Sequence, residues 1–132
     1  MENKRSRLLS ERDESAPKFL KLAHLYQLFR GKQQYILEML DIFTEQLPAA
    51  LLKMEEHIIS QDGKGVRYEA HTLKSTIKTI GLKSLVASIL RLELSEHDTW
   101  DEIKENYNIF KNEALIEVEA LNQERDILLK NE

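Results

Sequence analysis

The sequence predicts an all-α protein: an antiparallel up-down four-helix bundle with a short extra N-terminal helix. Three observations support this fold class. Apolar residues recur at helical spacing along most of the chain, only four glycines and two prolines interrupt it, and no segment alternates apolar and polar residues for long enough to require a strand. A chain of 132 residues is long enough to form one domain with its own core.

The N-terminal part is expected to hold a leader and one short helix. Residues 1–17 carry little periodic apolar signal, so we predict a flexible leader or linker there, and we assign residues 18–132 to the helical domain. Residues 18–29 have apolar positions at helical spacing, and Gly31 then interrupts the chain.

A long second helix is expected to start near Lys32 and to end in the loop at residues 61–65, which contains two glycines. Pro48 lies inside it. A proline removes one backbone hydrogen bond and crowds the preceding turn, so we predict a kink or a brief break at this point.

The third helix is predicted from Val66 to Ile80. Its apolar positions fall on one stripe, namely Val66, Ala70, Leu73, Ile77 and Ile80. Gly81 follows and is expected to end the helix as a left-handed cap.

The last two helices complete the predicted bundle. The fourth, from about Leu82 to Ser95, is apolar on most sides, which is typical of a central helix. Thr99 and Glu102 have the spacing of a capping box and mark the start of the fifth helix, which we expect to continue to Leu129 with a tail that outruns its partners. Short loops between amphipathic helices indicate the up-down topology.

Composition excludes several classes of function. The absence of cysteine excludes disulfides and thiolate metal sites, and a formal net charge of −4 gives no basic footprint for nucleic acid. No apolar run is long enough for a membrane span, and no signal peptide pattern opens the chain. We therefore expect a soluble, cytoplasmic protein. No two histidines stand four residues apart, and no E-x-x-H motif or phosphate-binding glycine loop occurs. We therefore expect no metal, no cofactor and no intrinsic kinase activity.

The third helix carries a chemically notable face. On a wheel of about 100° per residue with Leu73 at zero, the apolar stripe lies between about −20° and +60°, whereas His71 falls near 160°. Arg67, Lys74 and Lys78 fall beside His71 at about 100–140°, and Ser75 lies on its other side. The sequence therefore predicts an imidazole, three cations and a small hydroxyl residue on one exposed face.

This face suits a histidine that carries a phosphoryl group. Neutral imidazole is a nucleophile that forms covalent intermediates, and neighbouring cations stabilise a bound phosphate. Phosphoryl transfer needs mainly positioning and charge neutralisation. The alternative reading is an ordinary solvated helix face with an exposed histidine of no special role, and the spacing alone leaves both readings open.

A wider pattern resembles the histidine phosphotransfer (HPt) family of two-component phosphorelays. The segment Ala70-His71-Thr72-Leu73-Lys74-Ser75 is similar to that family's A-H-x-L-K-G, with Gly81 ten residues after the histidine and Leu92-Glu93 as the downstream L-E pair. Upstream, Leu40, Phe43 and Pro48 look like its L-x-x-F-x-x-x-x-P segment. The resemblance covers about residues 20–120.

The resemblance implies a role for each matching residue. His71 would be the phosphoacceptor and Lys74 would steady the phosphoryl group, while Ser75 departs from the family's usual glycine. Glu93 would orient the imidazole by accepting a hydrogen bond from its far N–H, although an ion pair with Lys74 or Arg91 is an alternative for this glutamate. Arg67 and Lys78 would contact phosphate or partner.

The resemblance also implies partners. Donor and acceptor would be receiver (response-regulator) domains, whose aspartate and Mg²⁺ supply the chemistry, and the chain could be a free carrier or a domain of a hybrid sensor histidine kinase. We expect no nucleic acid and no membrane insertion. Two rival functions remain at this stage: a non-catalytic helical adaptor, which Ser75 favours, and a bundle enzyme or metal carrier, for which no ligand set is present.

Overall fold

The computed structural model describes residues 21–130, so the predicted leader at residues 1–17 and the first residues of the predicted N-terminal helix lie outside the described residues. Five helices follow one another: α2 (Ala23–Leu28), α3 (Gln33–Ile59), α4 (Gly63–Ile80), α5 (Lys83–Glu93) and α6 (Trp100–Lys130). No strand occurs between residues 21 and 130.

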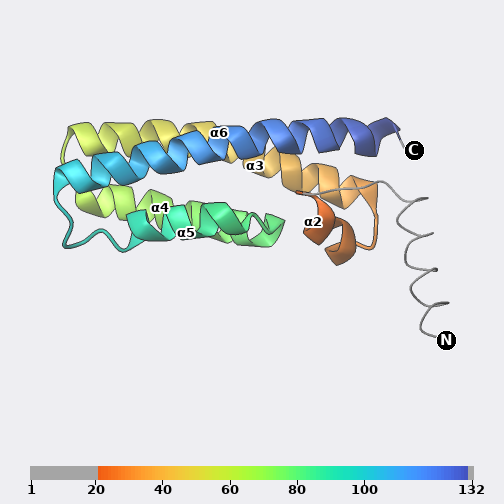
Figure 1. The fold of residues 1–132 in the computed structure, drawn as a ribbon, viewed down its shortest axis with the longest axis horizontal. Coiled ribbons are helices and arrows are strands. Elements are labelled where there is room, and N and C mark those ends of the chain that lie inside the picture. Colours follow the sequence, from red (N-terminus) through yellow and green to blue (C-terminus); the bar gives the residue numbers. More distant parts are fainter. Residues whose placement is uncertain (1–20, 131–132) are drawn as a thin grey trace.

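Four of these helices form the predicted antiparallel bundle (Figure 1). Each of α3, α4 and α5 packs on the helix that follows it in sequence, and α6 closes the bundle by returning beside α3. The fifth element, α2, is the short extra N-terminal helix and packs against α4. The predicted fold class is therefore confirmed, and α4 is held between α3 and α5 with one face left to solvent.

The predicted apolar stripe of α4 is the face that enters the core. All five of its members are buried, with at most traces of exposed surface: Val66, Ala70, Leu73, Ile77 and Ile80. Burial of several branched side chains at about 1.5–3 kcal/mol each fixes the rotation of the helix about its axis. That rotation determines which α4 residues point to water.

The start of α4 differs from the sequence prediction. The helix begins at Gly63, three residues before the predicted Val66, because Asp62 is its N-cap and the Asp62 side chain accepts a hydrogen bond from the Gly65 backbone N–H at 3.0 Å. N–H groups of a first turn have no partner inside the helix, and a side-chain cap supplies one. Gly63 and Gly65, which were predicted to lie in a loop, therefore belong to the first turn of α4.

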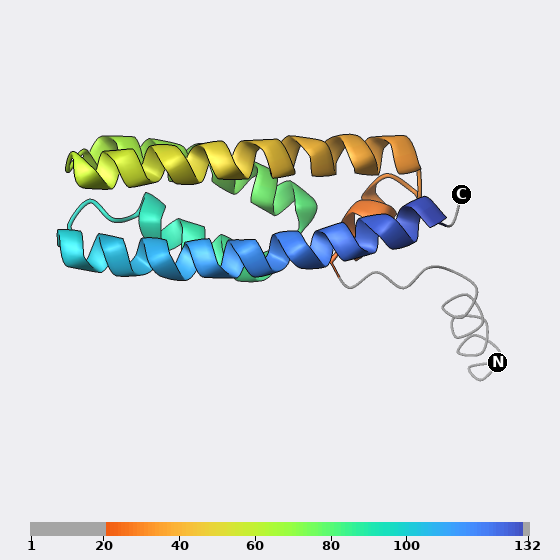
Figure 2. The same ribbon diagram turned by 90° about the horizontal axis from the view of Figure 1, so that it is seen from above.

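Of the kink or brief break predicted at Pro48, the break does not occur, because α3 runs without interruption from Gln33 to Ile59 (Figure 2). Pro48 lies on the exposed side of the helix. The carbonyl oxygen that loses its N–H donor on this side can be hydrated by solvent, which lowers the cost of keeping the helix intact. The L-x-x-F-x-x-x-x-P segment is thus one continuous helix.

The prediction that the fourth helix is central is also wrong. Helix α5 buries Leu85, Ile89 and Leu92 but leaves Leu90 at 37% and Leu94 at 68% exposure. It packs on α4 and α6 along two sides, and its outer side faces solvent. Apolar residues nearly all round a helix therefore indicated an exposed apolar surface here.

Gly81 ends α4 as predicted, with a left-handed φ of 89°. A Cβ atom at this position would lie 2.8 Å from the Cβ atom of His24, so the glycine also allows α2 to approach the end of α4. Both the backbone conformation and the close contact exclude a larger residue without local rearrangement.

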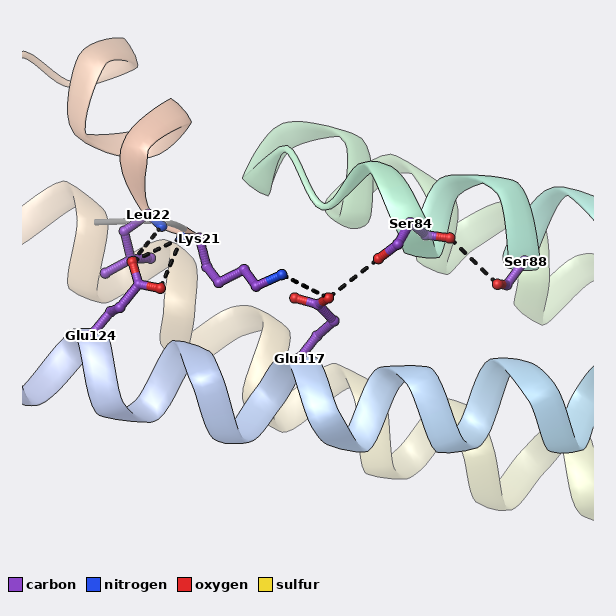
Figure 3. A network of polar contacts seen from close by, with 6 residues as sticks. All are labelled: Lys21, Leu22, Ser84, Ser88, Glu117 and Glu124. Atoms are coloured by element: carbon purple, nitrogen blue, oxygen red, sulfur yellow. Dashed lines mark hydrogen bonds and ion pairs between the residues drawn. The ribbon is translucent and has the colours of Figure 1, made fainter. Parts of the chain in front are cut away.

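The end of α6 does not project freely, contrary to the predicted tail, because Leu121 and Leu128 are buried and the Gln33 side chain of α3 donates a hydrogen bond to the Leu128 carbonyl. The Glu124 carboxylate, which is 8% exposed, accepts hydrogen bonds from the backbone N–H groups of Lys21 and Leu22 at 2.8–3.0 Å (Figure 3). Seven residues earlier on α6, the Glu117 carboxylate pairs with the Lys21 ammonium at 2.9 Å and accepts a hydrogen bond from the Ser84 hydroxyl at 3.2 Å. These two buried glutamates fasten the start of the described chain to α6.

Candidate functional site

The exposed histidine of α4 stands opposite the buried stripe, where the wheel placed it. The His71 side chain is 72% exposed, and Ala70 and Leu73 beside it in sequence are fully buried. The core therefore holds the backbone under His71 rigidly while its ring remains in water. This is a suitable arrangement for a group that another protein must reach.

A single carboxylate from α5 connects the two charged residues of the motif. Glu93 Oε2 lies 2.8 Å from Nδ1 of His71, and Glu93 Oε1 lies 2.6 Å from Nζ of Lys74. The Glu93 side chain is 16% exposed, so the bridge is largely shielded from water. The two alternatives that the sequence left open for Glu93, a contact with His71 and an ion pair with Lys74, are both present at once. The described ion pairs of Glu93 do not include Arg91.

This bridge assigns the proton on the His71 ring. The hydrogen bond from Lys74 holds the pKa of Glu93 below its usual value, and the bond from His71 acts in the same direction, whereas burial opposes them. An ionised carboxylate can only accept hydrogen bonds, so Nδ1 of His71 carries the hydrogen and donates it. The other nitrogen, Nε2, has no hydrogen-bond partner within residues 21–130, and in the neutral ring it is the nitrogen that carries the lone pair.

The three predicted cations near His71, namely Arg67, Lys74 and Lys78, have different surroundings. Lys74 is turned toward α5 and only 18% exposed, because it pairs with Glu93. The Arg67 guanidinium lies back along the helix, with Nη1 3.0 Å from the position that a Cβ of Gly63 would occupy. Lys78 is exposed. The three cations therefore do not form one open cluster around the imidazole.

The small residue at position 75 is exposed one turn after His71. Its backbone carbonyl accepts a hydrogen bond from the Thr79 hydroxyl at 3.0 Å, a bond that lies within the helix. Since a serine side chain adds only two heavy atoms to a helix backbone, the C-terminal side of the imidazole remains open.

Two further exposed residues of this face were missed by the sequence analysis. Lys64 and Tyr68 lie on the same side of α4 as His71, and Tyr68 is 67% exposed. The helical wheel of the predicted helix places Tyr68 near His71, whereas Lys64 falls in the predicted loop at residues 61–65 and is joined to this face because α4 begins at Gly63.

The remaining histidines have other surroundings. His57, at the end of α3, has Nδ1 3.3 Å from an Asp62 carboxylate oxygen, and His24 packs beside Gly81. Residues 21–130 contain no group of three or more histidine, aspartate or glutamate side chains arranged to hold a metal ion. In the same part of the chain, no helix is both long enough and apolar enough to cross a bilayer.

An up-down helical bundle with a water-exposed histidine, oriented by a carboxylate on the solvent face of α4, is an arrangement suited to carrying a group on imidazole. The family model of the Hpt domain matches residues 38–126, which is more than half of the chain, and the chain therefore belongs to the Hpt domain family. Hpt domains are phosphocarriers of two-component signalling and are not kinases. A comparison with curated proteins and one with solved structures found no match.

Proposed function

We propose that this protein is a phosphorelay intermediate: His71 accepts a phosphoryl group from the aspartate of one receiver domain and passes it to a second receiver domain. The observation that carries the proposal is the hydrogen bond between Nδ1 of His71 and Glu93, which leaves Nε2 as a free nucleophile on a side chain that is 72% exposed.

The transfer step balances with groups of this chain and of the donor. The lone pair of Nε2 attacks the phosphorus of the aspartyl phosphate, a P–N bond forms, and the P–O bond to the aspartate breaks with its electron pair returning to the carboxylate. The ring gains formal positive charge because Nδ1 keeps its proton. The Glu93 carboxylate, 2.8 Å away, stabilises that charge. Transfer to the second receiver is the reverse sequence.

The other residues of the motif have supporting roles in this proposal. The Lys74 ammonium keeps Glu93 ionised through their 2.6 Å contact and is close enough in sequence to steady the phosphoryl group on His71. Ser75 leaves space for the donor domain, and the exposed Lys78 meets the acidic surface of that domain. Arg67 would add to the positive electrostatic potential of the α4 face around His71. The aspartate and Mg²⁺ of the receiver would supply the remaining chemistry.

The test uses His71→Gln and a receiver domain carrying a radiolabelled phosphoryl group. We expect the label to appear on the wild-type chain and on the control His97→Gln, whose histidine is also exposed, and to be absent from His71→Gln. The label should be acid-labile and alkali-stable, as a phosphoramidate bond is. Labelling of His71→Gln at the wild-type rate would refute the proposal.

A non-catalytic adaptor is the second candidate, and the residue that favours it is Ser75 in the position of the family's glycine. An adaptor would bind receiver or kinase partners without taking phosphate from them. Binding of a receiver by the wild-type chain with no transferred label, under conditions where the receiver is phosphorylated, would identify this function.

A further inference from the structure

The solvent face of α4 carries a single straight row of residues with His71 at its centre. Its members follow one another at steps of four, three, four and three, and all are exposed: Lys64, Tyr68, His71, Ser75 and Lys78. Steps of three and four keep side chains on one side of a helix, with neighbouring Cβ atoms about 5–6 Å apart. A protein that covers the imidazole must therefore also cover the residues next to it.

The charges of this row are symmetric about the histidine. Lys64 stands seven residues before His71 and Lys78 seven residues after it, which is about 10 Å in each direction along the axis. An acidic surface placed over His71 meets one lysine at each end. Attraction to these two lysines would hold it almost equally well in either direction along α4, so Lys64 and Lys78 do not define an orientation.

The side chains on the two sides of His71 differ in size. Before His71 stands Tyr68, a large ring that is 67% exposed, and after His71 stands Ser75, which is small. Tyrosine has few rotatable bonds for its area and combines an apolar body with a polar tip, and for these reasons it is enriched among residues that dominate binding energy. The asymmetry is therefore the feature of the row that distinguishes one approach from the other.

We propose that Tyr68 is the specificity-determining residue of the phosphotransfer surface and that its partner is a receiver domain with an apolar depression beside its acidic pocket. This inference rests on the proposed function at His71. The Tyr68 ring enters the depression, the partner's bulkier edge lies over Ser75, and the two lysines meet acidic side chains at the rim. A receiver without the depression would collide with the ring while its aspartate was still distant from Nε2.

The experiment separates docking from chemistry. Isolated receiver domains from the source organism, each phosphorylated, serve as donors to the wild-type chain and to Tyr68→Ala and Tyr68→Phe. For the receiver used best by the wild type, we expect Tyr68→Ala to raise KM roughly 5- to 30-fold, the range expected when one of the minority of energetically important interface side chains is truncated, with little change in kcat. Tyr68→Phe should keep most of the affinity because it keeps the ring. The difference in kcat/KM between the receiver used best by the wild type and the other receivers should be smaller in Tyr68→Ala than in the wild type.

Two controls accompany these variants. Ile116→Ala removes an apolar side chain of similar exposure, 68%, from α6, which lies in the other layer of the bundle (Figure 1), and should leave KM unchanged. Phosphoramidate, a small donor that needs no docking surface, should label His71 in Tyr68→Ala at the wild-type rate.

Each outcome has a defined meaning. An unchanged KM and an unchanged receiver preference in Tyr68→Ala would overturn the inference while the proposed function stood. Slower labelling of Tyr68→Ala by phosphoramidate would show that Tyr68 acts on the imidazole itself, which also overturns it. If neither phosphoramidate nor any receiver labels the wild type, the proposed function fails and the inference fails with it.

Discussion

Glu93 and Glu124 are both largely buried, and each forms hydrogen bonds with two groups from another part of the chain. The two glutamates lie in different regions of the bundle. Glu93 bonds two side chains of α4, one of them 72% exposed, whereas Glu124 bonds two backbone N–H groups some hundred residues away. A carboxylate that bonds an ionisable side chain sets its proton and orientation. A carboxylate that bonds main-chain groups sets where a segment lies. The comparison teaches that the partner, more than the burial, decides whether a glutamate serves chemistry or assembly.

The largest effect is expected from Glu93→Gln. If this substitution changed only the stability of the fold and not the transfer to His71, the contrast between Glu93 and Glu124 would not hold. A hydrogen bond to a charged group contributes about 1.5–3 kcal/mol, so we expect phosphotransfer to His71 to slow roughly 10- to 100-fold. Nitrogen NMR of the ring should show a smaller share of the Nδ1–H tautomer. The melting temperature provides the control. Unchanged transfer and tautomer in Glu93→Gln would remove Glu93 from the proposed mechanism.

Glu124→Ala should give the opposite pattern. The variant leaves two N–H groups without their acceptor, one of them on the fully buried Leu22, and we expect the free energy of unfolding to fall by about 1–3 kcal/mol. Transfer to His71 should keep its wild-type rate. Urea unfolding measures the first quantity and receiver labelling the second. Glu119→Ala, an exposed glutamate of the same helix, should change stability by less than about 0.5 kcal/mol. A loss of transfer in Glu124→Ala would mean that the two regions are coupled.

The smallest effect is expected from Ser75→Gly, which restores the family's usual residue and sharpens the account of the exposed face. Replacing serine by glycine inside a helix lowers the free energy of unfolding by roughly 0.5 kcal/mol, because serine already lies below alanine in helix propensity. The transfer rate should not fall, because the side chain removed faces the incoming partner. Ala87→Gly, at an exposed position within α5, should lose at least as much stability with no effect on transfer. A slower Ser75→Gly would show that the serine hydroxyl takes part in the reaction.

The sequence was sufficient wherever the deciding interactions are local. The stripe of α4, its left-handed end at Gly81 and the rotation that exposes His71 follow from spacing within one helix. The capping box is also confirmed: the Glu102 backbone N–H donates to the Thr99 hydroxyl and the Thr99 backbone N–H to the Glu102 carboxylate, each at 3.2 Å.

The sequence was insufficient where the partner is distant. Nothing within α6 indicates that Glu117 and Glu124 fasten Lys21, since the residues stand about a hundred positions apart. A wheel of α4 places Lys74 beside His71 but does not show that its ammonium turns inward; the resemblance to the HPt family, and not the wheel, pointed to Glu93 of α5. The break at Pro48 does not occur for a related reason: the cost of a proline in a helix depends on whether its side of the helix faces water, and Pro48 is exposed.

The contacts of Lys21 with Glu117 and Glu124 determine where the described chain begins on the bundle. Lys21 and the last turns of α6 lie at the same end of the bundle (Figures 1 and 3), and α2 packs on α4 beside Gly81, about 15 Å along the helix from His71. Both ends of the described residues are therefore at one pole of the bundle, and the flank of α4 that carries His71 lies away from them.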